Sequence, residues 1–109
     1  MIKKNNKLLT KNVKHRKSLL SKAMGLMFSN KKNRIEVFHF DNYERISLHM
    51  LFVFYTINVA CLDKKGVVKE VAELKPFSFY KTREKCSVLL EYPKNYFDIK
   101  IGDKLEIYK

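Results

Sequence analysis

His49 and Asn58 lie nine positions apart in an otherwise nearly apolar run, residues 46–62, and are the first candidates for chemistry. An imidazole can exchange protons or bind a metal, and an amide can both donate and accept hydrogen bonds. Lys22 would be their basic neighbour if the segment that carries it packs across the same end of the domain. We therefore predict a ligand-binding or partner-binding site at Lys22, His49 and Asn58.

Catalytic and metal sites find little support in the residue spacing. His39 could join His49 as a second metal ligand, but the third ligand and the spacing of a catalytic zinc site are missing. The sequence also has no phosphate-binding glycine loop and no nucleophile elbow. We predict no catalytic residue, no cofactor and no metal. An unrecognised enzyme remains the alternative if His49 meets a carboxylate such as Asp41, Glu73 or Glu91 in a concave pocket.

The two cysteines, Cys61 and Cys86, stand 25 positions apart without CxxC or Cys/His spacing around them. This pattern predicts two reduced, buried thiols. No apolar stretch with a small-residue cleavage site follows the basic start of the chain, so no secretory signal is predicted. Both observations favour a cytoplasmic protein.

The net charge of +12 comes almost wholly from the first third of the chain. Residues 1–35 hold eleven Lys and Arg and no Asp or Glu, whereas twelve basic and eleven acidic residues follow. A segment of one charge sign attracts phosphate backbones, so weak nucleic-acid binding through Lys14, Arg16 and Lys17 is a second hypothesis. Biased genome composition would explain the same lysines. Phe28 is the only aromatic residue of this segment, which offers little for base stacking.

The apolar run is too short to cross a membrane as a helix, because its 17 residues rise only about 26 Å. As one strand it would extend about 57 Å, which exceeds the diameter of a domain of this size. The run must therefore bend or break, and Tyr55–Thr56 marks the expected place. Both of its faces are apolar near the middle, which predicts a strand between two layers. Asn58 is expected to accept hydrogen bonds from backbone N–H groups at the bend.

The remaining pattern predicts one short helix and several strands. Apolar residues at helical spacing over residues 18–27 indicate the helix, and strands are expected on either side of residues 41–44, which have the composition of a turn. Asp63 and Gly66 predict a tight hairpin, Pro76 a break in pairing, and Gly102–Asp103 a turn before a last strand. The predicted fold class is mainly β (α+β), a compact antiparallel barrel or sandwich-like domain. A basic segment, residues 1–11, would precede a single domain over residues 12–109.

Five stretches in register resemble the domain of unknown function 192 family, and within it the small archaeal members. They are KAMGLMF, SLHMLFVFYTINVACLDKKGVV, LKPFSFY, SVLLEYP and IKIGDKLEIY, and together they extend over residues 12–108. The resemblance implies a mostly antiparallel β domain with one short helix near its start. Its motif positions fall on Gly25, Leu26, Met27, His49, Met50, Asp63, Pro76, Leu90, Glu91, Gly102 and Asp103.

This sequence departs from the family pattern at three positions. Thr56 replaces a proline, Asn58 replaces an aspartate and Lys22 replaces an arginine. If that aspartate were a catalytic base, Asn58 could not do its work, because an amide does not take up a proton at neutral pH. The family has no established reaction. We therefore predict a non-catalytic binding or accessory module that recognises a protein partner or a small ligand.

Overall fold

A computed structural model describes residues 1–4, 7–10, 14–17, 35–49, 56–94 and 97–108. Every regular element in this part is a strand, and no helix there could cross a membrane. The helix predicted over residues 18–27 lies outside the described residues. The strands are β1 Ile2–Lys4, β2 Lys7–Thr10, β3 Lys14–Lys17, β4 Glu36–Glu44, β5 Ser47–His49, β6 Ile57–Leu62, β7 Val68–Leu74, β8 Phe79–Lys81, β9 Cys86–Pro93 and β10 Leu105–Ile107.

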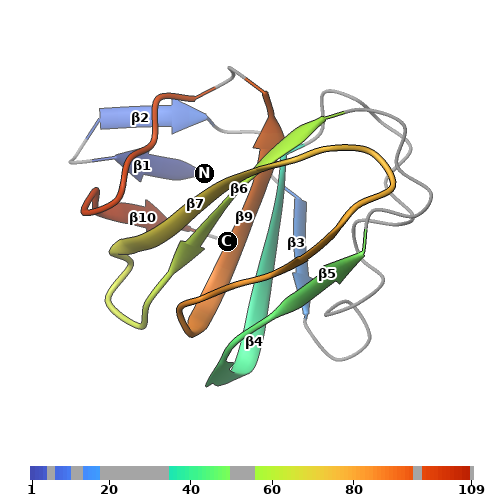
Figure 1. Ribbon diagram of the computed structural model, residues 1–109. Coiled ribbons are helices and arrows are strands. Elements are labelled where there is room, and N and C mark those ends of the chain that lie inside the picture. Colours follow the sequence, from blue (N-terminus) through green and yellow to red (C-terminus); the bar gives the residue numbers. More distant parts are fainter. Residues whose placement is uncertain (5–6, 11–13, 18–34, 50–55, 95–96, 109) are drawn as a thin grey trace.

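The strands form three sheets (Figure 1). The central sheet has five strands in the order β3-β4-β9-β6-β7, and β10-β1-β2 and β5-β8 form two smaller sheets. All pairs are antiparallel except β3 with β4. A mainly β, antiparallel fold is thus confirmed, but the predicted barrel is wrong. The central sheet stays open because β3 and β7 are its two edges.

Apolar side chains cover both faces of the central sheet. Within β6, Val59 and Cys61 belong to one buried cluster, whereas Ala60 and Leu62 belong to the other. Alternation along a strand explains this division, because successive side chains point to opposite faces. The first cluster continues into Ile46 and Tyr80, next to β5 and in β8, and the second into residues of β1 and β10. The prediction of a strand buried between two layers is confirmed for β6.

The long apolar run is divided between two sheets, as its length requires. Its beginning forms β5, which pairs with β8, and its end forms β6, which pairs with β7 and β9. The predicted break is therefore confirmed, although residues 50–55 lie outside the described part. The predicted turn over residues 41–44 is wrong, because β4 continues to Glu44. The register against β9 shifts between His39 and Glu44, so polar turn-type residues occupy an irregular part of the strand.

The first residues of the chain join its end. β1 pairs with β10, the Met1 ammonium group donates a hydrogen bond to the Tyr108 carbonyl oxygen (3.0 Å), and the Tyr108 N–H donates to the Met1 carbonyl oxygen (2.8 Å). Ile2 is fully buried in the second cluster. The segment that the charge pattern set apart as residues 1–11 therefore contributes two strands and a core residue.

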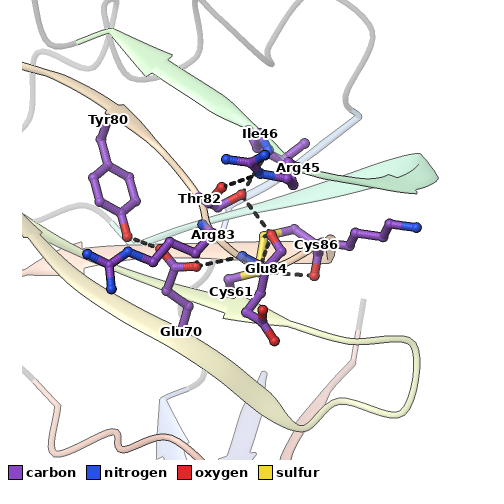
Figure 2. Close-up of a disulfide and its surroundings, with 10 residues drawn as sticks. Arg45, Ile46, Cys61, Glu70, Tyr80, Thr82, Arg83, Glu84 and Cys86 are labelled. Atoms are coloured by element: carbon purple, nitrogen blue, oxygen red, sulfur yellow. Dashed lines mark hydrogen bonds between the residues drawn. A yellow bond between two sulfur atoms is a disulfide. The ribbon is translucent and has the colours of Figure 1, made fainter.

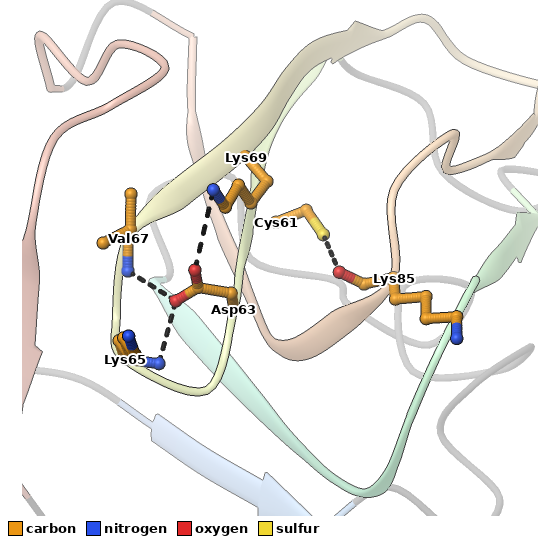
Figure 3. Close-up of polar contacts among 6 residues, drawn as sticks. All are labelled: Cys61, Asp63, Lys65, Val67, Lys69 and Lys85. Atoms are coloured by element: carbon orange, nitrogen blue, oxygen red, sulfur yellow. Dashed lines mark hydrogen bonds and ion pairs between the residues drawn. The ribbon is translucent and has the colours of Figure 1, made fainter.

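The turn between β6 and β7 forms as its residue types predict (Figure 3). Asp63 Oδ1 accepts hydrogen bonds from the backbone N–H groups of Lys65 (2.8 Å) and Val67 (3.0 Å). Gly66 has a φ of +85°, and a Cβ atom there would lie 2.5 Å from the Leu105 carbonyl oxygen. Only glycine satisfies both conditions. The predicted turn at Gly102–Asp103 is also confirmed, since Asp103 Oδ2 accepts from the Lys100 N–H (2.8 Å).

Asp63 should make the free energy of unfolding depend on pH in the acid range. Burial opposes its charge, but the Val67 and Lys65 N–H groups and the Lys69 ammonium group hold the pKa of Asp63 below its ordinary value. Because the folded pKa is the lower one, this stabilisation is present above the unfolded pKa of about 3.9 and is lost as the pH falls through the folded value. Asp63→Asn keeps the acceptor and should lose less stability in urea melts between about pH 4 and pH 2. Parallel acid curves for wild type and Asp63→Asn would refute the assignment.

The predicted reduced thiols are wrong, because Cys61 and Cys86 form a disulfide (Figure 2). Cys61 lies in β6 and Cys86 begins β9, and their Cα atoms are 5.4 Å apart. The fold brings together two residues that the sequence leaves 25 positions apart, although Leu89, not Cys86, is the residue in register with Cys61. The expected cytoplasmic location rested partly on reduced thiols and loses that support.

Candidate ligand-binding site

A pocket of about 230 Å³ opens beside β6, β7 and the segment that follows β9. We call it the Asn58 pocket. Its polar and aromatic lining comes from Asn58, Glu73, Tyr92, Phe97 and Asp98. The residues are brought together by register, because Asn58 pairs with both Glu73 of β7 and Tyr92 of β9.

Asn58 provides a buried acceptor without a donor. Its Oδ1 atom has no hydrogen-bond partner among the described residues. Its amide group does hydrogen-bond to the side chain of Tyr92, so the amide nitrogen must donate to the hydroxyl oxygen. The prediction that Asn58 accepts from backbone N–H groups at a bend is therefore wrong. An orphaned acceptor costs about 1–3 kcal/mol of desolvation, which a donor brought by a ligand would recover.

Tyr92 forms the inner wall of the pocket. Its side chain is buried, and its ring lies 5.4 Å from that of Phe97, centroid to centroid, at a tilt of 47°. Burial raises the pKa of the Tyr92 hydroxyl above its ordinary value, the hydrogen bond from Asn58 works against that rise, and the charge of Asp98 adds to it. The hydroxyl therefore stays protonated and neutral across the physiological range.

Two carboxylates stand at the mouth of the pocket. Glu73 pairs with Lys94 (3.1 Å), and both side chains are about half exposed, so this ion pair contributes little to stability. Asp98 makes no ion pair within the part of the chain that the structure describes. The pocket therefore combines a buried amide oxygen, two aromatic rings and a carboxylate that forms an ion pair with no described residue. This chemistry suits a ligand with N–H donors and positive charge.

The other two predicted site residues are not brought to this pocket in the described structure. Lys22 lies outside the described residues. His49 ends β5, and its backbone pairs with Phe79 of β8. Ile46, which precedes β5, and Tyr80 of β8 pack on the face of the central sheet that carries Val59. Asn58 lies on the opposite face. A ligand role for His49 stays a prediction.

A pair of acidic residues inside the central sheet was missed by the sequence reasoning. Glu36 of β4 and Glu91 of β9 are opposite each other in the register and are 0% and 2% exposed. Charges so placed in an apolar interior need compensation by positive charge or by a proton. The signal was present, because Glu36 shares its face with Phe38, which lies two positions along the same strand. Glu91 lies on the face opposite to the Asn58 pocket, so it does not join Glu73 there.

The family comparison agrees with this architecture. The model of domain of unknown function 192, described as "Uncharacterized ACR, COG1430", matches residues 1–107. The chain belongs to this family. Of the positions on which the resemblance fell, Gly25, Leu26, Met27 and Met50 lie outside the described residues.

The described positions of the domain of unknown function 192 pattern are chiefly turns. Asp63, Gly102 and Asp103 build the two turns described above. Pro76 follows β7 and precedes a residue of positive φ, Phe77 at 61°, so the predicted break in pairing is confirmed. Leu90 and Glu91 are exceptions, since both are buried in β9, and His49 is another, since it ends β5.

Relatives and solved structures support the same family and fold. The chain is 28% identical to a UPF0127 protein of Thermococcus sibiricus, over 95% of this chain and 71% of the relative. It is 29% identical to a UPF0127 protein of Pyrococcus furiosus, over 82% of this chain and 80% of the relative. A protein of unknown function from Novosphingobium aromaticivorans has a similar structure, with a TM-score of 0.74 at 17% identity over 87% of this chain and 74% of that one. At this identity the likeness concerns the fold alone.

Proposed function

We propose that this protein is a non-catalytic binding module and that the Asn58 pocket takes a small ligand with a primary ammonium group. The observation that carries the proposal is the buried Oδ1 atom of Asn58, which lies in a lined pocket and accepts no hydrogen bond. Buried acceptors in native proteins are nearly always satisfied, and a ligand donor would satisfy this one.

The surroundings favour an ammonium group over a neutral donor. The ligand nitrogen would donate to Asn58 Oδ1, and the Tyr92 and Phe97 rings would face its positive charge. The Asp98 carboxylate would balance that charge at the mouth. Among the described lining residues, no nucleophile is in contact with a base, and binding alone accounts for these residues.

The proposal can be tested by thermal unfolding with butylammonium chloride, against sodium butyrate and n-butanol at equal ionic strength. A ligand at ten times its Kd stabilises the folded state by about 1.4 kcal/mol, which raises the midpoint by about 5 °C or more. We expect this shift with butylammonium alone. Asn58→Ala should abolish it, whereas Asn58→Asp should strengthen it, because a carboxylate makes charge-assisted hydrogen bonds.

Thr56→Ala is the matched control. Thr56 is half-buried, directly precedes β6 and lies two residues before Asn58, but it does not line the pocket. The variant should keep the full shift. Equal shifts for butylammonium and n-butanol, or a shift that survives in Asn58→Ala, would show that the amide oxygen does not recognise the ligand.

A further inference from the structure

A second hollow, of about 400 Å³, lies between the β6–β7 turn and β10. We call it the lysine groove, because Lys64, Lys65 and Lys104 line it. His39 and Tyr108 also contribute to its walls. The described residues that line it and those that line the Asn58 pocket are entirely different.

The acidic residues in the lysine groove are already engaged. Asp63 accepts two backbone N–H groups and pairs with Lys69 (3.8 Å), which lies outside the groove. Glu106 accepts a hydrogen bond from the Tyr108 hydroxyl. The ammonium groups of Lys65 and Lys104 make no ion pair with any described residue. The groove lining thus has three lysines against two carboxylates, one of which is paired with Lys69, so its net charge is positive and attracts anions.

Two exposed tyrosines stand next to this positive charge. Tyr108 is 42% exposed and Tyr43 is 36% exposed. Each has a lysine over its ring, with Nζ 5.8 Å from the centroid for Lys3 over Tyr108 and 5.4 Å for Lys64 over Tyr43. A single nucleotide can stack its base on such an exposed ring and place its phosphate against the adjacent ammonium group.

The backbone of the edge strand β3 lies close to the lysine groove. β3 runs parallel to β4, with Lys17 in register with His39, which lines the lysine groove. Neighbouring strands lie about 4.8 Å apart, so the backbone of the segment KHRK is one strand away from the groove wall. The residues predicted for nucleic-acid binding, Lys14, Arg16 and Lys17, are all on this strand.

We infer that the lysine groove binds single-stranded nucleic acid. The phosphates contact Lys64, Lys65 and Lys104, and unpaired bases stack on Tyr43 and Tyr108. A base that stacks on either ring displaces the lysine above it, and that lysine is then available for a phosphate. Single strands are favoured over duplexes because the bases of a duplex already stack on one another.

The inference can be tested on the full chain by fluorescence anisotropy. The probe is a labelled oligothymidylate of twelve nucleotides, and its binding is measured at a series of salt concentrations. The triple variant Lys64→Gln, Lys65→Gln, Lys104→Gln should bind at least tenfold more weakly. The plot of log K against log[salt] has a negative slope, and the magnitude of this slope should decrease by about 2 in the triple variant. Each lost phosphate contact on a single strand accounts for about 0.7 of this decrease. Tyr108→Ala should weaken binding roughly tenfold, in the range of one lost stacking contact, with little change of slope.

Two controls separate the groove from general charge attraction. The variant Lys75→Gln, Lys81→Gln, Lys85→Gln removes the same charge from exposed lysines outside the groove and should change affinity less than threefold. Tyr108→Phe keeps the ring, loses the bond to Glu106 and should bind normally. Equal losses in the two triple variants, or equal affinity for a matched duplex, would overturn the inference, as would full binding by Tyr108→Ala.

Discussion

Replacing Cys61 and Cys86 together by alanine should lower the free energy of unfolding by about 3–4 kcal/mol. The bridge closes a loop over the 25-residue separation and so restricts the unfolded chain. The chain-entropy relation gives about 3.5 kcal/mol for a loop of this length. Both residues are buried, at 1% and 0% exposure, so the substitution also removes packed sulfur atoms.

Urea melts of oxidised wild type, reduced wild type and the double variant measure this effect. Reduced wild type should resemble the double variant, and the double variant should not respond to reductant. Thiol titration in denaturant without reductant should find no free thiol in purified protein. Two free thiols per chain would show that the bridge is absent. A double variant as stable as oxidised wild type would show that the bridge does not stabilise the protein.

Replacing Glu70 by alanine should cost about 3–5 kcal/mol, because three hydrogen bonds to one buried carboxylate are lost together. Glu70 is 8% exposed. Its Oε1 atom accepts the N–H groups of Arg83 (2.7 Å) and Glu84 (2.9 Å), and its Oε2 atom accepts the Tyr80 hydroxyl proton (Figure 2). The carboxylate thus holds the connection between β8 and β9 against β7.

The same connection is held from its other side by Thr82. The Thr82 Oγ1 atom accepts the Ile46 N–H (2.9 Å), and the Thr82 N–H donates to the Ile46 carbonyl oxygen (2.9 Å). The carbonyl oxygen of Lys85 lies 3.4 Å from Cys61 Sγ (Figure 3). Glu70, Thr82 and the disulfide therefore hold one short loop at three points, which explains why the loss of Glu70 cannot be absorbed by a small shift.

Glu70→Gln is the matched control for the alanine substitution. Its amide oxygen can accept both N–H groups, and its amide nitrogen can donate to the Tyr80 oxygen, so the cost should stay at about 1 kcal/mol or less. Hydrogen exchange of the Arg83 and Glu84 amides adds a local measurement. Exchange should accelerate in Glu70→Ala and stay slow in Glu70→Gln. A cost below about 1 kcal/mol for Glu70→Ala would mean that water replaces the carboxylate.

Features that depend on neighbours in the chain were predictable from the sequence. The turn at Asp63 and Gly66 needs a side-chain acceptor and, a few positions later, a residue that can adopt a positive φ. Both residue types can be recognised in the sequence. The break of the apolar run follows from its length, and the two-sided burial of β6 follows from its nearly continuous apolar sequence.

Features that depend on strand register were decided by the tertiary structure. The disulfide between Cys61 and Cys86 depends on how β6 and β9 lie together in the fold, although Leu89 is the residue in register with Cys61, and no local pattern encodes it. The same holds for Glu36 opposite Glu91 and for Asn58 beside Tyr92. A shift by one residue would move each of these side chains to the other face of the sheet.

The sequence by itself thus determined the family, the mainly β class and the turns at Asp63–Gly66 and Gly102–Asp103, because short-range hydrogen bonding and the apolar pattern specify them. The tertiary structure decided that the sheet stays open, that the cysteines join and that Asn58 faces a pocket away from β5. It also gathered Lys64, Lys65 and Lys104 into one groove from two distant segments. These features come from contacts between residues far apart in the chain, and such contacts form only when the strands pair in register.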